Sequence, residues 1–304
     1  MATGSDETAK TTLRLAIGLV VAVVALSTAA PFFRLAEPTH PLAAAALRLA
    51  TAFLILLPFL WRAHSAQRTD RQFWSHSMLA GSFYALHFGA WVTSLTLTSV
   101  AASVTIVTAT PVLLAIWALV TARDIPTGRT WLALAIAATG IIVIGGHDMG
   151  VSTDHLVGDG LALLGAGAMA GYLLVARRMG GDLDILAFMA VATGTGALLL
   201  YGACFATGVD PTPASTKALI FLVLAALIPQ LIGHNLLTWA LRHTTPTTVG
   251  IATVGEPVGA TILAWLWLGE SVSFVVALGC AITITGVVVA ITALRPTKPR
   301  SAPV

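Results

Sequence analysis

Charged side chains are scarce in this 304-residue chain. Asp, Glu, Lys and Arg make up 10% of the residues and hydrophobic residues 57%, whereas charged residues reach about 25% in an average soluble domain. So few polar groups cannot cover the surface of a soluble fold of this length, which excludes a soluble enzyme and a disordered chain. The formal net charge is only +3, so we expect no nucleic-acid partner.

Cysteine and the common catalytic motifs are equally sparse. Cys204 and Cys280 lie in separate apolar stretches and provide neither a disulfide framework nor a metal-ligand spacing. The His and Asp residues of 147–159 contain no ligand pair at helical spacing, so we expect no metal there. No phosphate-binding Gly-rich loop and no hydrolase motif are present, and we predict no cofactor and no catalytic site. No cleavage site follows a short apolar core near the N-terminus, so we expect no removed signal peptide.

Long apolar runs are what the sequence has in abundance. A membrane-crossing helix needs about 20 mostly apolar residues. Ten windows qualify: 13–33, 40–60, 74–97, 100–121, 130–145, 157–176, 185–207, 217–241, 247–268 and 272–294. The fifth window is short, and the third and fourth are almost continuous. The sequence therefore predicts an all-α integral membrane protein with ten transmembrane helices.

The basic residues predict how these helices are oriented. If both termini lie on one side, 13 of the 16 Lys and Arg residues fall on that side. Only Arg34 and Lys217 fall on the other side, and Arg48 lies within a span. Under the positive-inside rule this distribution predicts cytoplasmic N- and C-termini and an even number of spans.

The chain also contains an internal repeat. A shift of 146 residues aligns 95–144 with the second half without a gap. The aligned positions include Pro111 with Pro257, Asp124 with Glu270, and Gly140 with Gly286. Each repeat holds five spans, and because five is odd the second copy is inverted in the membrane, as in many secondary transporters. We predict a cytoplasmic tail (1–12), a first repeat (13–146), a periplasmic linker (147–156), a second repeat (157–294) and a cytoplasmic tail (295–304), with a central cavity between the repeats.

Away from the ends of the predicted spans, only two charged side chains lie within them, Arg48 and Glu256. A charge at this depth costs about 2.5–3.5 kcal/mol on insertion scales and usually has a function. Two interpretations of each stay open. Arg48 faces the cavity or extends its side chain to the headgroups. Glu256 faces the cavity, where it can carry a proton, or is a hydrogen-bonded packing residue.

Two sets of three residues complete the candidate binding site: Tyr84, His87 and Trp91 in the third span, and Gln230, His234 and Asn235 in the eighth. The first three share one helix face at spacings i, i+3 and i+7. Packing of the aromatic stripe and interhelical hydrogen bonding of the second group are the alternatives. His87 and His234 are 147 residues apart, within one residue of the repeat shift, and we interpret them as roughly symmetry-related.

Pro111 and Pro257 lie in mid-span at equivalent positions of the two repeats. Each removes one backbone hydrogen bond and is expected to kink its helix. Such kinks either provide a flexible point for gating or form a static bend.

The segment 233–270, GHNLLTWALRHTTPTTVGIATVGEPVGATILAWLWLGE, resembles the second EamA-type repeat of the drug/metabolite transporter superfamily. Its Ala-Leu-Arg, its Glu-Pro-Val and its closing Leu-Gly-Glu carry the resemblance. PLAAAALRLATAF at 41–53, which includes Arg48, is similar to that family's second span, and 98–111 and 159–178 are similar to its fourth and sixth. The family's first repeat often has Gly-Glu-Arg where this chain has Ala-Arg-Asp at 122–124, a departure that affects a loop.

The resemblance implies a ten-helix carrier whose cavity is lined mainly by spans one, three, four, six, eight and nine. It also implies export of amino acids, metabolites or drugs across a bacterial inner membrane. We predict a secondary transporter, not an enzyme, that moves small metabolites, with amino acids the leading class, by alternating access. We expect its partners to be the substrate, the lipid bilayer and, if transport is coupled, protons. We expect the protein to be a monomer or a homodimer. Drug efflux, a passive channel and an intramembrane enzyme are the alternatives.

Overall fold

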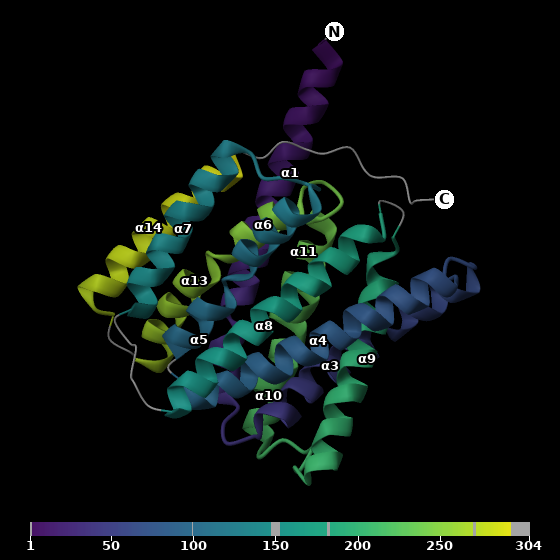
Figure 1. Ribbon diagram of the computed structural model, residues 1–304. Helices are drawn as coiled ribbons and strands as arrows, with labels where there is room; N and C mark the ends of the chain where they lie inside the picture. Colours follow the sequence, from purple (N-terminus) through teal and green to yellow (C-terminus); the bar gives the residue numbers. More distant parts are fainter. Residues whose placement is uncertain (1, 99, 147–152, 181–182, 270–271, 293–304) are drawn as a thin grey trace.

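A computed structural model describes residues 2–98, 100–146, 153–180, 183–269 and 272–292 (Figure 1). Within these ranges the chain forms helices joined by turns and contains no strand, so the all-α prediction is confirmed for them. Most of the predicted linker 147–156 and the tail 295–304 lie outside the described residues, as does Glu270.

The described part of the first half contains seven helices: α1 (Ala2–Ser27), α2 (Ala29–Leu35), α3 (Pro41–Ser65), α4 (Arg71–Leu97), α5 (Val100–Val107), α6 (Thr110–Thr121) and α7 (Gly128–Gly146). The second half contains α8 (Thr153–Arg178), α9 (Ile185–Thr207), α10 (Thr216–Ala225), η1 (Ala226–His234), α11 (Asn235–Ala240), α12 (Pro246–Thr253), α13 (Glu256–Leu263), η2 (Ala264–Leu268) and α14 (Phe274–Thr292). The η segments are wider π-helical turns, in which each N–H bonds five residues back.

Among the described residues, eight helical segments are long and apolar enough to cross a membrane. Two further helices coincide with predicted spans but fall short of these criteria. α7 contributes a shorter apolar stretch, Gly128–Val143, and α4 is not among the eight. The structure thus confirms a multi-pass helical membrane protein, while the count of ten spans stays a prediction.

Several helices are interrupted near the middle of the bundle. α5 ends at Val107 and α6 begins at Thr110, with Pro111 as its second residue. In the second half α12 ends at Thr253 and α13 begins at Glu256, directly before Pro257. Proline has no N–H to donate, so the regular hydrogen-bond ladder cannot continue through either position. Both prolines therefore mark breaks in their helices.

The packing of equivalent helices shows their relative direction. Gly196 of α9 faces Leu49 of α3, while Gly194 faces Phe53, so the two helices run antiparallel. α7 and α14 lie side by side and also run antiparallel, because Gly140 faces Thr283 whereas Gly286 faces Ala137 (Figure 1). Antiparallel contact between the second helices of both halves, and between the fifth, is what two inverted repeats require.

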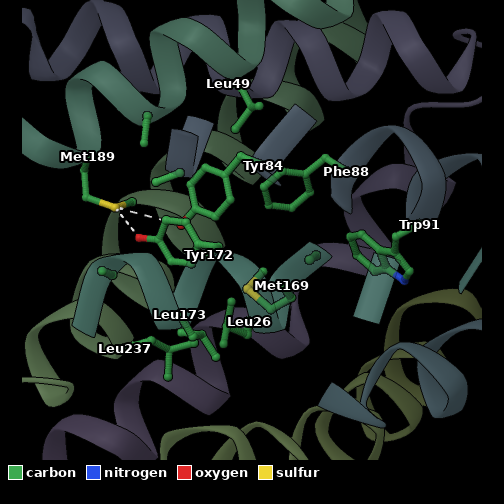
Figure 2. Close-up of a cluster of buried hydrophobic side chains, with 14 of the residues drawn as sticks. Leu26, Leu49, Tyr84, Phe88, Trp91, Met169, Tyr172, Leu173, Met189 and Leu237 are labelled. Atoms are coloured by element: carbon green, nitrogen blue, oxygen red, sulfur yellow. Dashed lines mark hydrogen bonds between the residues drawn. The ribbon is translucent and has the colours of Figure 1, made fainter. Parts of the chain in front are cut away.

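The side chains divide between a packed interior and an apolar exterior. The largest buried cluster is centred on aromatic rings, among them Tyr84, Phe88 and Tyr172, which are fully enclosed (Figure 2). Large apolar side chains such as Trp61 and Phe205 are more than 70% exposed. An apolar outer face suits a bundle whose solvent there is lipid.

Candidate functional site

A small cavity lies inside the bundle. Its walls come from α1, α2, α3, α4, α5, α6, α8, η1, α11, α12 and α13, which correspond to predicted spans one to four, six, eight and nine. Span two contributes Arg48 in addition to the six spans that the resemblance implied. The cavity measures about 40 Å³, enough for about three water molecules.

The lining residues follow the internal repeat. Four pairs of them are related by the shift of 146: Phe88 with His234, Trp91 with Leu237, Val107 with Thr253, and Thr110 with Glu256. The cavity therefore lies on the axis that relates the two halves. At this shift His87 corresponds to Gly233, so the two cavity histidines are offset by one position rather than being true partners.

Arg48 of α3 is the largest fully buried side chain among the described residues, with 0% exposure. Its guanidinium carbon lies 4.3 Å from the centre of the Phe88 ring and 5.7 Å from that of Phe33. Aromatic faces attract a cation but do not form conventional hydrogen bonds with its N–H groups. None of the three guanidinium nitrogens has a hydrogen-bond partner within the described residues. The guanidinium is enclosed by protein and borders the cavity, unlike a side chain extended to the headgroups.

Glu256 lies across the same cavity as the first residue of α13. Its main-chain carbonyl accepts a hydrogen bond from the Ser27 hydroxyl at 3.3 Å, which joins α13 to α1. No direct ion pair links its carboxyl group to Arg48 in the described part of the chain, although both residues line the cavity. An arginine and a glutamate thus line one small space without forming an ion pair.

The two histidines differ in their hydrogen bonds. Nδ1 of His87 lies 2.8 Å from the carbonyl oxygen of Gly165. A carbonyl only accepts, so Nδ1 carries a proton and, in the neutral ring, Nε2 is left as an acceptor. Nδ1 of His234 has no partner among the described residues. The pair can therefore offer both donor and acceptor atoms to a ligand.

The rings of Tyr84, Phe88 and Tyr172 form an aromatic wall (Figure 2), and Tyr84 and Phe88 each pack edge-on against His234 with centroids 5.6 Å apart. The rings of Tyr84 and Tyr172 stack with centroids 4.1 Å apart and planes 16° apart. The Tyr172 hydroxyl lies 2.7 Å from the Thr238 hydroxyl and 3.0 Å from the Met189 sulfur. His87 in turn stacks on the Trp91 indole, with centroids 6.0 Å apart. These contacts hold the imidazole and indole rings at the cavity wall.

The structure brings five of the eight predicted binding residues to the cavity: Arg48, His87, Trp91, His234 and Glu256. The other three lie outside its lining. Tyr84 packs in the aromatic wall, Gln230 is buried within η1, and the Asn235 amide at the start of α11 donates to the Leu231 carbonyl of η1 at 2.7 Å.

Sequence reasoning did not identify several lining residues, of which Thr110 is the most informative. It directly precedes Pro111, as Glu256 directly precedes Pro257. Its hydroxyl donates to the carbonyl of Ala166 at 3.2 Å, which joins α6 to α8. The aligned prolines were the available signal, because the residue before each of them borders the cavity.

A wider hollow of about 320 Å³ opens beside α6, α8 and α12. Arg123, Asp124 and Arg178 line it, and Arg123 and Arg178 are exposed. Leu173 borders the cavity and the next residue, Leu174, borders the hollow. α8 therefore lines both spaces. Among the described residues no group of three His, Cys, Asp or Glu side chains is arranged to hold a metal ion.

Comparison with known proteins agrees with this geometry. A solved structure titled only "Crystal structure of protein" matches with a TM-score of 0.73 and 18% identity, over 91% of this chain and 96% of that one. At this identity the match shows a shared fold alone. No curated protein matches the chain. The family model described as "EamA-like transporter family" matches twice, at residues 13–146 and 156–292, which confirms the internal repeat and the family resemblance. The chain therefore belongs to the EamA-like transporter family.

Proposed function

We propose that the protein is a secondary transporter that exports small metabolites, amino acids foremost, by alternating access. The observation that carries the proposal is the cavity on the repeat axis, lined by both halves and bordered by Arg48 and Glu256, which form no ion pair with each other among the described residues. Two halves with the same fold and opposite orientation can exchange conformations, which opens a central site to each side in turn.

The arrangement of the helices supports ten passes with both termini in the cytoplasm. α4 is less apolar than its neighbours because it carries cavity residues such as His87, and protein rather than lipid surrounds these. Polar groups at membrane depth are tolerated when they face a cavity, so α4 can still span the membrane. If the helices cross the membrane in alternation, Arg62, Arg129 and Arg178 fall at helix ends on the side from which α1 starts, as the positive-inside rule requires for a cytoplasmic face of the inner membrane.

The present conformation supports an inward-facing path. The wider hollow lies at the proposed cytoplasmic end, whereas aromatic contacts close the other end. There Phe33 packs edge-on against Trp91 at 5.8 Å, and Phe32 stacks on Trp267 at 5.7 Å. A space for about three waters is too small for an amino acid, so substrate entry must widen the cavity. We propose that the breaks at Pro111 and Pro257 let α6 and α13 move during this step.

We assign the binding roles from the chemistry of the wall. Trp91 stacks on an apolar part of the substrate, and His87 and His234 bind its polar groups. Tyr84 becomes part of the cavity lining when the cavity widens, since its ring already packs against the ring of His234 with centroids 5.6 Å apart. Gln230 and Asn235 join only if η1 and α11 shift, because neither borders the present cavity.

Counterflow in proteoliposomes tests the proposal. Vesicles loaded with an unlabelled amino acid should take up the labelled one faster than empty vesicles, with saturable kinetics. Flux that rises linearly without trans-stimulation would instead indicate a channel, and chemical alteration of the recovered label an enzyme. Protein-free vesicles provide the control.

Coupling to protons is a further part of the proposal, with Glu256 or His87 as the carrier. Uptake should then change when an ionophore collapses an imposed pH gradient. Unchanged uptake would leave a uniporter or an exchanger.

A further inference from the structure

We propose that the cavity binds a dipolar, net-neutral molecule, with Arg48 holding its anionic group and Glu256 its cationic group. This inference rests on the proposed transport function and deepens it. It assigns one pole of the substrate to each half of the protein, since Arg48 belongs to the first repeat and Glu256 to the second.

The anionic pole follows from the surroundings of Arg48. A buried charge is tolerated when it is paired and hydrogen-bonded, and is costly otherwise. Arg48 is fully buried, yet none of its nitrogens has a partner within the described residues. The rings of Phe88 and Phe33 offset part of this cost and leave the N–H donors unused. A carboxylate matches the guanidinium fork and would satisfy two of these donors.

The cationic pole follows from Glu256. Its carboxylate faces the space that Arg48 borders, and no direct ion pair joins the two in the described part of the chain. A ligand carrying only a negative charge would leave Glu256 unpaired, and one carrying only a positive charge would leave Arg48 unpaired. A ligand with both charges satisfies both residues and adds no net charge to the low-dielectric interior.

The rest of the wall indicates the remainder of the ligand. Most other lining side chains are apolar, including Leu26, Met169 and Leu237, and the polar ones are threonines and histidines. Within the described lining Arg48 and Glu256 are the only Lys, Arg, Asp or Glu residues. The geometry therefore favours a dipolar head with an uncharged, largely apolar tail, and disfavours a third charge.

Three matched probes test the two poles separately: L-phenylalanine, its decarboxylated amine phenethylamine, and its deaminated acid 3-phenylpropionate. Dissociation constants are measured by ligand-induced thermal stabilisation of the purified protein. Counterflow of phenylalanine is measured in parallel. We expect the wild-type protein to bind phenylalanine about thirtyfold or more tightly than either analogue, since an unpaired buried charge costs at least this factor.

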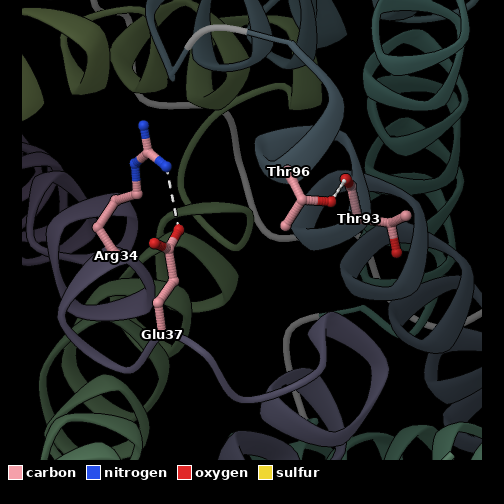
Figure 3. Close-up of polar contacts among 4 residues, drawn as sticks. All are labelled: Arg34, Glu37, Thr93 and Thr96. Atoms are coloured by element: carbon pink, nitrogen blue, oxygen red, sulfur yellow. Dashed lines mark hydrogen bonds and ion pairs between the residues drawn. The ribbon is translucent and has the colours of Figure 1, made fainter. Parts of the chain in front are cut away.

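Two substitutions should produce a crossed pattern. Arg48→Gln should weaken binding of phenylalanine and the acid about thirtyfold without weakening binding of the amine, whereas Glu256→Gln should weaken binding of phenylalanine and the amine without weakening binding of the acid. The matched control is the exposed ion pair Arg34–Glu37 at the end of α2, with a separation of 3.0 Å (Figure 3). Arg34→Gln and Glu37→Gln remove the same charges outside the cavity and should change none of the three constants.

Folding of the variants is monitored as unliganded thermal stability. Arg48→Gln removes a charge without hydrogen bonds, so its melting temperature should equal or exceed that of the wild type. Arg48→Lys keeps the positive charge but loses the paired N–H donors of the guanidinium, so it should retain part of the affinity for the acid. This variant keeps the test valid if Arg48→Gln does not fold.

The possible results separate the two proposals. Saturable counterflow of phenylalanine with equal losses for all three probes in both variants would overturn the pole assignment and leave the transport function standing. Binding of the amine or the acid as tightly as phenylalanine would do the same. Absence of both binding and counterflow for phenylalanine, and for leucine and threonine tested alongside it, would overturn the amino-acid assignment together with the inference.

Discussion

The crossing of α7 and α14 and the central cavity both lie on the repeat axis. The two halves contribute equivalent residues to the crossing and different residues to the cavity. At the crossing the halves supply the same residue, because Gly140 and Gly286 are related by the shift of 146. A methyl group on Gly140 would lie 2.5 Å from the main-chain nitrogen of Thr283, and one on Gly286 would lie 2.5 Å from that of Ala137. Both positions therefore require glycine for the same steric reason.

In the cavity the same shift pairs unlike residues. Thr110 corresponds to Glu256, and Phe88 corresponds to His234. Close approach of two helices constrains each helix separately, so a steric requirement must be met twice. A single cavity shared by both halves needs each chemical group only once. The comparison indicates that the scaffold retains the symmetry of the repeat while the binding chemistry does not.

The largest effect is expected at the crossing. Gly140→Ala and Gly286→Ala should each lower the free energy of unfolding by about 1–3 kcal/mol, because the methyl group must push the backbone of the partner helix away. The two losses should be similar, since the contacts are equivalent. Thermal unfolding of the purified variants measures both.

Gly167 is the matched control for the crossing. It lies in the middle of α8, where an added Cβ would meet nothing within 4 Å. Gly167→Ala should therefore raise stability by about 0.5–1 kcal/mol through helix propensity alone. Equal behaviour of all three alanine variants would show that the close crossing does not limit stability.

Moving the carboxyl group across the axis tests the asymmetry of the cavity. Glu256→Thr should raise the half-saturation concentration for phenylalanine about thirtyfold by removing a buried charge partner. Adding Thr110→Glu to that variant restores one carboxyl group at the equivalent wall position, so part of the loss should be recovered. Counterflow in proteoliposomes measures both variants.

The single variant Thr110→Glu is the control for this transposition. It places two carboxyl groups in one cavity, so phenethylamine should gain affinity relative to phenylalanine. If the double variant folds and remains as inactive as Glu256→Thr, the position of the carboxyl group, and not its presence, determines binding. The two walls of the cavity would then not be interchangeable.

Much of the scaffold could be predicted from sequence because its causes are local or periodic. Apolar runs identify helices, and the gap-free shift that aligns Pro111 with Pro257 identifies the repeat, which the family matches confirm. The cost of a charge in lipid singled out Arg48 and Glu256, and the structure brings both to one cavity.

The details of the site depend on helix irregularities that the sequence pattern does not specify. The π-helical segment η1 changes the residues per turn, so helical spacing no longer tells which of Gln230, His234 and Asn235 faces inward. Of these only His234 borders the cavity. Tyr172 was missed as a member of the aromatic wall, because its partner Tyr84 lies on another helix and no sequence spacing relates them.

The smallest effect is expected at the first turns of α7 and α14, where the two halves again use equivalent residues. The hydroxyls of Thr127 and Ser273 are related by the shift of 146 and cap α7 and α14, each accepting a hydrogen bond from a main-chain N–H three residues later at 3.3 Å. Thr127→Ala and Ser273→Ala should each cost about 0.5–1 kcal/mol, at the lower end for cap losses because both bonds are long. Thermal unfolding should show nearly equal shifts, and transport should be unaffected. A loss confined to one cap would show that the ends of α7 and α14 are held differently, and would restrict the symmetry of the scaffold to the crossing itself.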